Sequence, residues 1–361
     1  MPISPCTRKA PLLHDPPVQC RLEPALEIIY LPKQKVPSPE SIKVQNQISN
    51  LLKTRQIPNS STKQKLTNNL KLQNNEWFCS FQGASSNVKT SLSEARIADL
   101  CIFCRKYGID FLLIQETHLS GNFDKKLKDI PSFKNWRIIG SGQGGNHKKA
   151  GVAILFSPKV KVEEYEIVES ARIISAKILL NGQPLVVTSC YTPDMSYADS
   201  TRGVFWRKLN NYMKKIPKIY QKITAGDFNA CLVPDGGEHR GLGSFHPRCC
   251  YQKATVNNEN GNELLQSVSD HNMFLENTYF ENRKSCHSWT HHNIGGWKRR
   301  YDFFMVDSLV HKYSTNCRSH PSPIKSDHRL ICPLKKYIFH GFFKSMHFFN
   351  QNLDFFEFLK F

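Results

Sequence analysis

The chain has 361 residues, of which 40% are hydrophobic and 11% aromatic, so it can fill the core of one large domain or of two ordinary ones. Its 49 basic and 30 acidic residues give a net charge of +19, which favours a polyanionic partner such as nucleic acid or an acidic membrane surface. No apolar run approaches the ~20 residues that span a bilayer, and the first residues are too polar for a signal peptide. We therefore expect no membrane span and a nuclear or otherwise intracellular protein whose 12 cysteines stay reduced.

The composition of residues 1–75 predicts a flexible basic arm with one short helix near 40–54. This segment holds eleven Lys and Arg residues against four Asp and Glu residues, and it is rich in Pro, Ser, Asn and Gln. Such a composition buries too little apolar area to offset chain entropy. From Trp77 onward short apolar runs alternate with turn residues, which predicts a folded domain over 76–337. For the Phe-rich extension 338–361, an amphipathic docking segment and a poorly structured tail both stay open.

The first strong element is a helix in "SLSEARIADLCIFCRKYG". It begins with a Ser91/Glu94 capping box and ends at Gly108, and its apolar face includes Cys101 and Cys104. Because these two cysteines lie on the apolar face and no second CxxC follows, we interpret them as buried structural thiols rather than zinc ligands.

A series of apolar runs then predicts packed sheets. Further helices are expected near 199–215 and 260–270. Fully apolar strands are covered on both faces, so the sheets should pack together with helices outside. The strand-like runs are "IDFLLIQET", "GVAILF", "RIISAKILL", "LVVTSCY", "KITAGD", "YDFFMV" and "HRLICPL".

Polar side chains stand where these runs end or begin. Strand ends converge at the edge of a packed sheet, so these residues can meet although they are scattered along the chain. Carboxylates and amide oxygens suit a hard cation such as Mg²⁺, whereas zinc favours His and Cys. A histidine beside a carboxylate is held in one tautomer and becomes more basic. The residues concerned are Glu116, Tyr191, Asp227, Asn229, Asp302, Asp327 and His328.

The motifs "IQET", "CYTPD", "GDFN", "RYDFFMVD" and "SDH", in this order, resemble the endonuclease/exonuclease/phosphatase superfamily. Within it, "LLIQETHLS", "GVAILFSP" and "GDFNA" are similar to the apurinic-type endonuclease domain of LINE-type (non-LTR) retrotransposons. The similarity covers about 77–336. It implies an α/β four-layer sandwich, with two packed mixed β-sheets flanked by helices, and metal-dependent cutting of DNA that leaves a 3′-hydroxyl and a 5′-phosphate.

The resemblance also implies a role for each matching residue. Glu116 would hold Mg²⁺, or Mn²⁺ in its place, with Asp327 in the same or a supporting role. Asp227 would orient or deprotonate the attacking water. Asn229 would bond to the water or to a phosphate oxygen, and Tyr191 would contact the phosphate. His328, positioned by Asp302, would stabilise the charged transition state.

The chain departs from the superfamily pattern in several places. The first strand normally ends in Trp-Asn, whereas "FCSFQGAS" offers Phe81 and Gln82. We therefore assign Gln82 to the metal site in place of the usual Asn. Some relatives have an Asp two residues after that amide, where this assignment gives Ala84. Asp194 replaces an Asn, and "YD" replaces "ID". None of these changes removes a central ligand, and we expect activity.

Two loops add further candidates. Cys286, His287, His291 and His292 could form a zinc cluster, but their spacing matches no standard zinc site. We therefore expect a solvated loop there. The basic, Gly-flanked segments "GGNHKK" and "GGWKRRYD" favour contact with DNA. The residues that we assign to DNA binding are Lys298, Arg299 and Arg300.

The sequence thus predicts a Mg²⁺-dependent DNA endonuclease that nicks target DNA in the manner of a retrotransposon. In that family a reverse transcriptase follows the nuclease, and the 361 residues leave no length for one. Two alternatives stay open on the same fold, an abasic-site repair endonuclease and a phosphatase of small phosphoesters. A catalytically silent nucleic-acid-binding module is a third, suggested by Gln82 and by the missing polymerase.

Overall fold

A computed structural model describes residues 77–341, apart from 129, 144–149, 234–238, 246–255, 281–288, 293–297 and 333–336. The chain divides into two units, Met1–Gln73 and Asn74–Phe361, and every described residue belongs to the second. The expected helix near 40–54, the segment "GGNHKK" and most of the Phe-rich extension lie outside the described residues. Among the described residues, no helix is long and apolar enough to cross a bilayer.

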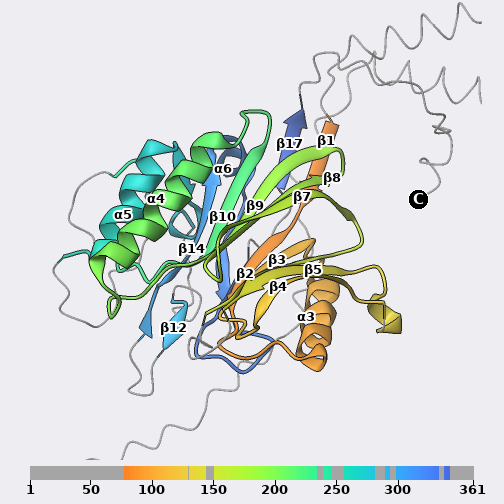
Figure 1. The fold of residues 1–361 in the computed structure, drawn as a ribbon. Coiled ribbons are helices and arrows are strands. Elements are labelled where there is room, and N and C mark those ends of the chain that lie inside the picture. The colour runs from red at the N-terminus through yellow and green to blue at the C-terminus, as the bar shows by residue number, and fades with distance from the viewer. Residues whose placement is uncertain are drawn as a thin grey trace, which may run out of the picture. The chain divides into compact units, whose positions relative to one another are not determined.

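Two mixed sheets form the centre of the fold (Figure 1). In the first sheet only β2 and β3 run parallel, and in the second only β9 and β10. The first sheet has the order β15(Arg318–His320), β16(Leu330–Cys332), β2(Gly83–Asn87), β3(Phe111–Gln115), β6(Val152–Phe156), β5(Arg137–Gly142) and β4(Gly121–Lys126). The second has the order β11(Met273–Leu275), β14(Asp302–Asp307), β10(Gln221–Asp227), β9(Gln183–Tyr191), β8(Ile173–Leu180) and β7(Val160–Glu169).

Short elements complete the described chain. Two strand pairs stand beside the sheets, β1(Trp77–Phe81) with β17(Tyr337–Gly341) and β12(His291–His292) with β13(Lys298–Arg299). The helices are α3(Glu94–Tyr107), α4(Asp199–Lys215), α5(Glu259–Asp270) and α6(Ser308–Tyr313), and the 3-10 turns are η1(Pro131–Phe133) and η3(Glu276–Thr278).

The alternation of side chains along a strand produces four layers. On β3, Phe111 and Leu113 join the core between the two sheets, whereas Leu112 and Ile114 pack under α3. On the far side, Phe205 and Trp206 of α4 pack against the outer face of the second sheet. Figure 1 shows α3 outside one sheet and α4 with α5 outside the other. The expected four-layer sandwich is therefore confirmed.

Helix α3 shows how local signals fix an element. Gly108 ends it with a φ of 67°, in the left-handed region where glycine is favoured, as expected. Its N-cap, however, is Ser93 and not Ser91, because the hydroxyl of Ser93 accepts the N–H of Arg96. Cys101 and Cys104 are buried and free, and burial raises the pKa of the Cys101 thiol to about 12. The structural interpretation of the CxxC is thus confirmed.

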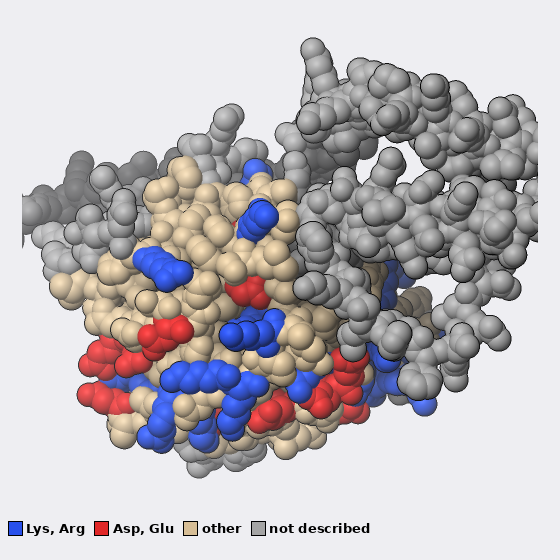
Figure 2. Space-filling model, turned by 90° about the horizontal axis from the view of Figure 1, so that it is seen from above, with Lys and Arg blue, Asp and Glu red and all other residues tan. Residues whose placement is uncertain are grey.

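Charged side chains are mixed on one end of the molecule. Figure 2 views the end at which β1 and β17 lie in Figure 1, and Lys and Arg are interspersed there with Asp and Glu. The described part of this face therefore presents no continuous basic track.

Candidate active centre

The sheet topology brings distant residues to one edge of the sandwich. Because β2 and β3 run parallel, both end at the same edge, with Asn87 last in β2 and Glu116 directly after β3. The parallel pair β9 and β10 ends in Tyr191 and Asp227, and Asp227 stands opposite Asp302 on β14. Ser189 of β9 accepts from Gln115 of β3 at 2.9 Å, so a buried polar contact joins the two sheets near this edge.

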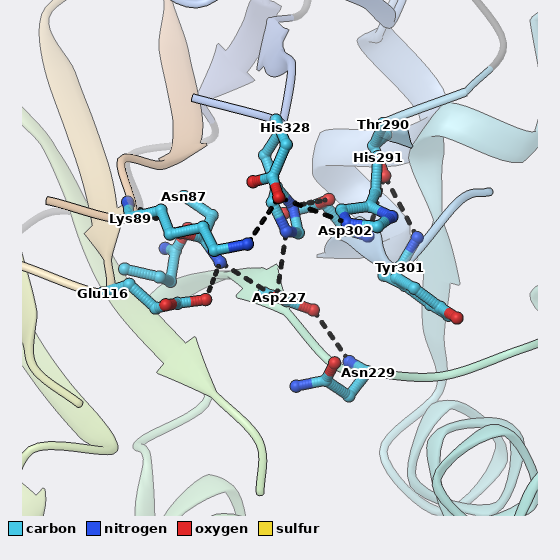
Figure 3. A network of polar contacts seen from close by, with 12 residues as sticks. Asn87, Lys89, Glu116, Asp227, Asn229, Thr290, His291, Tyr301, Asp302 and His328 are labelled. Carbon is cyan, nitrogen blue, oxygen red and sulfur yellow. Dashed lines mark hydrogen bonds and ion pairs between the residues drawn. The ribbon is translucent and has the colours of Figure 1, made fainter. Parts of the chain in front are cut away.

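One amide connects two carboxylates in this centre (Figure 3). The side-chain nitrogen of Asn87 donates to Oε1 of Glu116 at 2.8 Å and to Oδ2 of Asp227 at 3.0 Å. Asn87 is fully buried and Glu116 is 7% exposed. An amide nitrogen carries two hydrogens, so both are used here to hold the carboxylates side by side. Glu116 adopts a φ of 50°, which turns its side chain out of the line of β3.

Asp227 is the most constrained acid of the centre. It is 2% exposed, and its Oδ1 accepts the backbone N–H of Asn229 at 2.9 Å. Burial, followed by the charge of Asp302, raises the pKa of Asp227 to about 7, although His328 and the Asn229 N–H oppose the shift. A carboxyl group with a pKa near 7 is suited to accept a proton at neutral pH.

His328 is held between two acids. Its Nδ1 lies 2.9 Å from Oδ2 of Asp302, and its Nε2 lies 3.8 Å from Oδ2 of Asp227. Burial opposes the charged imidazolium, but the charge and hydrogen bond of Asp302, with Asp227 and Glu116, outweigh it and raise the pKa of His328 to about 9. Asp302 is itself anchored, since Thr290 Oγ1 accepts its backbone N–H at 3.1 Å. The imidazole thus has a fixed orientation and a stabilised proton.

The donor set fits a divalent cation. Ligand atoms of Glu116, Asp227 and His328 all lie within 4.8 Å of one another, and these three residues are buried. Two carboxylates that crowd in a buried site need compensating positive charge, and carboxylate oxygens are the ligands that Mg²⁺ and Mn²⁺ prefer. The residues that could hold such an ion are therefore Glu116 and Asp227, with His328 beside them.

Gln82 is a wrong assignment. It stands before β2, whereas the centre lies at the other end of that strand. Its side-chain nitrogen donates to the sulfur of Cys332 at 3.2 Å, and its backbone N–H donates to Asp110. The amide of the centre is Asn87, and the residue two positions later is Lys89 rather than Ala84. The signal in the sequence was the amide in "GASSN" at the end of a strand of small residues, which do not look like an apolar run.

Tyr191 and Asn229 lie at the edge of the centre. Burial raises the pKa of the Tyr191 phenol, as do Glu116 and Asp227, and Arg172 stacks over its ring at 4.7 Å. Asn229 has a φ of 45°, and its side-chain nitrogen donates to the carbonyl of Thr192 at 2.8 Å. Its backbone N–H, rather than its side chain, is what contacts Asp227.

Asp327 and His291 form a second group beside His328. Asp327 pairs with Lys89 at 2.5 Å, and its Oδ2 lies 3.6 Å from Nε2 of His291. The rings of His291 and His328 are 4.7 Å apart between centroids. Burial is the largest cause that lowers the pKa of His291, to about 4. The expected solvated loop is wrong for His291, which lies in β12 with its side chain 17% exposed, whereas His292 is exposed as expected. Cys286 and His287 lie outside the described residues.

The three residues assigned to DNA contact differ in their surroundings. Lys298 is exposed, with its ammonium 5.4 Å from the centre of the Trp289 ring. Arg299 is half-buried and donates to the hydroxyl of Tyr301. Arg300 is 4% exposed and donates to the carbonyl of Asn277 at 2.8 Å, so its assignment to DNA is wrong. Arg300 lies between β13 and β14, and its bond to Asn277 holds the guanidinium inside the protein.

A groove of about 530 Å³ opens next to Asn229. Loops after β9 and β10 line it together with Arg299 and Tyr301, which precede β14. Its volume is within the usual range for sites that take a small molecule or part of a polymer.

Two packed mixed sheets with acids, an amide and a histidine at one edge define an α/β sandwich protein with a buried acidic centre. The model of the Endonuclease/Exonuclease/phosphatase family matches residues 82–328, and the chain belongs to this family. Its members are in general hydrolytic nucleases and phosphatases.

Solved structures share the fold at low sequence identity. The AP endonuclease LMAP from Leishmania major aligns with a TM-score of 0.51 at 13% identity, over 73% of this chain and 88% of that one. The 3′ phosphatase NExo from Neisseria, bound to a product DNA hairpin, aligns with a TM-score of 0.51 at 15% identity, over 70% of this chain and 98% of that one. The endonuclease domain of TRAS1, a telomere-specific non-LTR retrotransposon, aligns with a TM-score of 0.49 at 14% identity, over 73% of this chain and 100% of that one. No curated protein matches the chain significantly in sequence.

Proposed function

We propose that this protein is a Mg²⁺-dependent endonuclease that hydrolyses phosphodiester bonds of DNA and nicks target DNA in the manner of retrotransposon nucleases. The observation that carries the proposal is the buried chain Asp302–His328–Asp227, joined to Glu116 through the amide of Asn87. Buried acids by themselves could belong to a structural ion pair and would not indicate catalysis. An oriented imidazole between two acids, beside a cation site, is an arrangement that hydrolysis at phosphorus can use.

Each side chain has a part in the proposed reaction. Asp227 takes the proton of the attacking water, whose oxygen forms the new bond to phosphorus. The bond to the 3′ oxygen breaks, and that oxygen takes up a proton, which leaves a 3′-hydroxyl and a 5′-phosphate. His328 directs its Nε2–H toward the phosphate oxygens, on which negative charge develops. Asn229 and Tyr191, at the edge of the centre, contact the phosphate.

Glu116 and Asp227 would hold the divalent ion, Mg²⁺ or Mn²⁺. When bound there, such an ion neutralises charge on the phosphate and on the attacking oxygen. Asn87 contributes by holding the two carboxylates at one position, so that they need not reorganise during the reaction. Asp327 takes a supporting role beside Lys89.

DNA is the substrate that the charge and the groove support. The net charge of +19 favours a polyanion. The groove beside Asn229 carries Arg299 and Tyr301, a guanidinium and a ring that suit a phosphate and a base, and Lys298 is exposed nearby in the sequence. A nuclear or otherwise intracellular location follows from a DNA substrate and is part of the proposal.

The test is nicking of supercoiled plasmid by the full chain, with Mg²⁺ or with EDTA. We expect nicking in Mg²⁺, none in EDTA, and a loss of about 10³-fold or more in Asp227→Ala. Asp270→Ala, an exposed acid on α5, is the matched control and should nick as the wild type does. Cleavage that persists in EDTA or in Asp227→Ala would refute the mechanism.

Parallel substrates separate the alternatives. A duplex with one abasic site, cut far faster than intact plasmid, would identify a repair endonuclease. Hydrolysis of a small phosphomonoester without any effect on DNA would identify a phosphatase. Binding of DNA without hydrolysis of any substrate would leave a silent binding module.

A further inference from the structure

Lys89 places a fixed positive charge at the mouth of the centre. It follows the buried Asn87 by two residues, and its backbone N–H donates to the side-chain oxygen of Asn87 at 3.1 Å. Its φ of 46° turns the chain at this point. Figure 3 shows the side chain reaching from the Asn87 side of the centre across to the His328 side. There its ammonium meets Oδ2 of Asp327 at 2.5 Å.

The ammonium stands where a second metal ion would otherwise find ligands. Asp327, whose Oδ2 Lys89 contacts, belongs to a group whose other members are His291 and His328, with one ligand atom of each residue within 4.8 Å of the others. A divalent ion at this group would lie against the ammonium, and like charges at such separations repel strongly in a partly buried site. In the group of Glu116, Asp227 and His328, the ion pairs seen for the two acids among the described residues are with histidines, His118 at 3.7 Å and His328 at 3.8 Å.

The ammonium also remains accessible to a substrate. The side chain of Lys89 is 49% exposed, whereas that of Asp327 is 28% exposed. An ammonium carries three donors, and Asp327 uses one of them. A lysine of this kind acts as a point charge toward phosphate. Here its backbone is anchored to Asn87.

We propose that Lys89 takes the place of a second divalent ion in this centre. Its ammonium neutralises Asp327 and offers its remaining donors to a non-bridging oxygen of the scissile phosphate. Glu116 and Asp227 would then hold a single divalent ion. The inference rests on the proposed function, because it concerns the binding of a phosphodiester in the same site.

The first experiment counts metal ions. Mn²⁺ bound per full-length chain is measured by electron paramagnetic resonance for the wild type and for Lys89→Asp. We expect one ion in the wild type and two in Lys89→Asp, because the substitution removes the ammonium and adds a carboxylate next to Asp327. Two ions in the wild type, or one in a folded Lys89→Asp, would overturn the proposal.

The second experiment measures single-turnover plasmid nicking by Lys89→Met at one equivalent of Mn²⁺ per chain, so that a second ion does not replace the ammonium. We expect a loss of about 10²-fold, since one contact to the phosphate is removed. Lys125→Met is a matched control, because Lys125 is 44% exposed and pairs with Glu94 at the same 2.5 Å, away from the centre. It should nick as the wild type does. Lys89→Met with wild-type nicking would overturn the proposed phosphate contact.

The two failures can be told apart. If neither the wild type nor Lys125→Met cleaves any DNA, the proposed function fails, and the Mn²⁺ count still decides whether Lys89 excludes a second ion. Thermal melting by circular dichroism verifies that each variant is folded. If Lys89→Asp does not fold, Lys89→Met is counted in its place, with a second ion expected because Asp327 is freed.

Discussion

At the scale of the residue, the centre depends on a single amide that serves two acids. Asn87 is buried, and both of its side-chain hydrogens are bonded to carboxylates of different sheets. Without it, Glu116 and Asp227 would be held apart by their own repulsion. Gln82 has the same functional group but donates to Cys332 at the other end of the strand. The two amides therefore offer a direct comparison.

We expect Asn87→Ala to lower the nicking rate by about 10² to 10³-fold, because the carboxylates lose their common donor. Gln82→Ala should stay within about threefold of the wild type, since it removes a bond to a buried thiol far from the chemistry. Single-turnover nicking of plasmid, with folding verified by circular dichroism, measures both. The opposite ranking would show that the sequence-based assignment of Gln82 was right.

Asp302 is expected to set the proton affinity of His328. In Asp302→Asn the carboxylate that favours the imidazolium is gone, while burial, which disfavours it, remains. The pKa of His328 should therefore fall from about 9 toward or below the ordinary 6.5. Nuclear magnetic resonance titration in EDTA follows the imidazole signals of the two proteins. An unchanged pKa would mean that Asp302 does not orient this imidazole.

At the scale of the element, parallel strand pairs carry the acids to one edge, and the close approach of β9 and β10 fixes Asp227. A Cβ atom on Gly226 would lie 1.9 Å from the carbonyl oxygen of Cys190, which belongs to the backbone of β9. A backbone atom cannot move aside as the end of a side chain can.

Gly226→Ala should therefore force β10 away from β9. We expect a loss of roughly 1–3 kcal/mol in the free energy of unfolding, from urea titration. Nicking should fall too, since Asp227 is the next residue. Gly203→Ala, on α4 where a Cβ atom meets nothing within 4 Å, is the control and should be neutral or slightly stabilising. A Gly226→Ala protein as stable as the wild type would contradict the packing argument.

The end of α5 gives a prediction for pH. Burial, followed by the charges of Lys222 and Lys214, lowers the pKa of His271 below 6.5, although Asp270 opposes the shift. The unfolded chain therefore binds a proton more readily than the folded one, so this group costs stability as the pH falls below about 6.5. In His271→Gln, which keeps a polar group near Asn210, the decline of stability from pH 7 to pH 5 should be shallower. An identical decline would show that His271 is not the group responsible.

At the scale of the whole molecule, basic charge is shared between the folded unit and the arm before it. Residues 1–75 hold eleven Lys and Arg against four Asp and Glu. The described face in Figure 2 mixes both signs, so the charge excess does not gather on that face.

Removal of residues 1–73, which leaves the unit Asn74–Phe361, should weaken DNA binding and flatten its salt dependence. Each lost phosphate contact reduces the slope of log Kobs against log salt by about 0.9. Fluorescence anisotropy at several salt concentrations measures the slope for both chains. Nicking at saturating DNA should persist, because the centre lies within the retained unit. Equal slopes would mean that the arm takes no part in binding.

The sequence by itself determined the sandwich, the limits of α3, α4 and α5 to within a few residues, and the acids that directly follow apolar runs. Glu116 and Asp227 stand out because a buried strand stops at each of them, and a carboxyl group that interrupts such a run needs a reason. Gly108 stands out for a similar local cause, since a helix end with positive φ favours glycine. These features depend on neighbours in the sequence.

Tertiary structure alone decided the contacts between segments far apart in the chain. Asn87 lies in a strand of small residues, and its role appears only when β2 pairs with β3 and faces β10. Lys89 reaches Asp327 across 238 positions of sequence, and His291 meets His328 through an isolated backbone bridge. Arg300 follows two basic residues yet is buried, because its guanidinium donates to the carbonyl of Asn277, 23 positions earlier in the chain. Strand pairing and side-chain direction set these outcomes, and neither is encoded within a short window of residues.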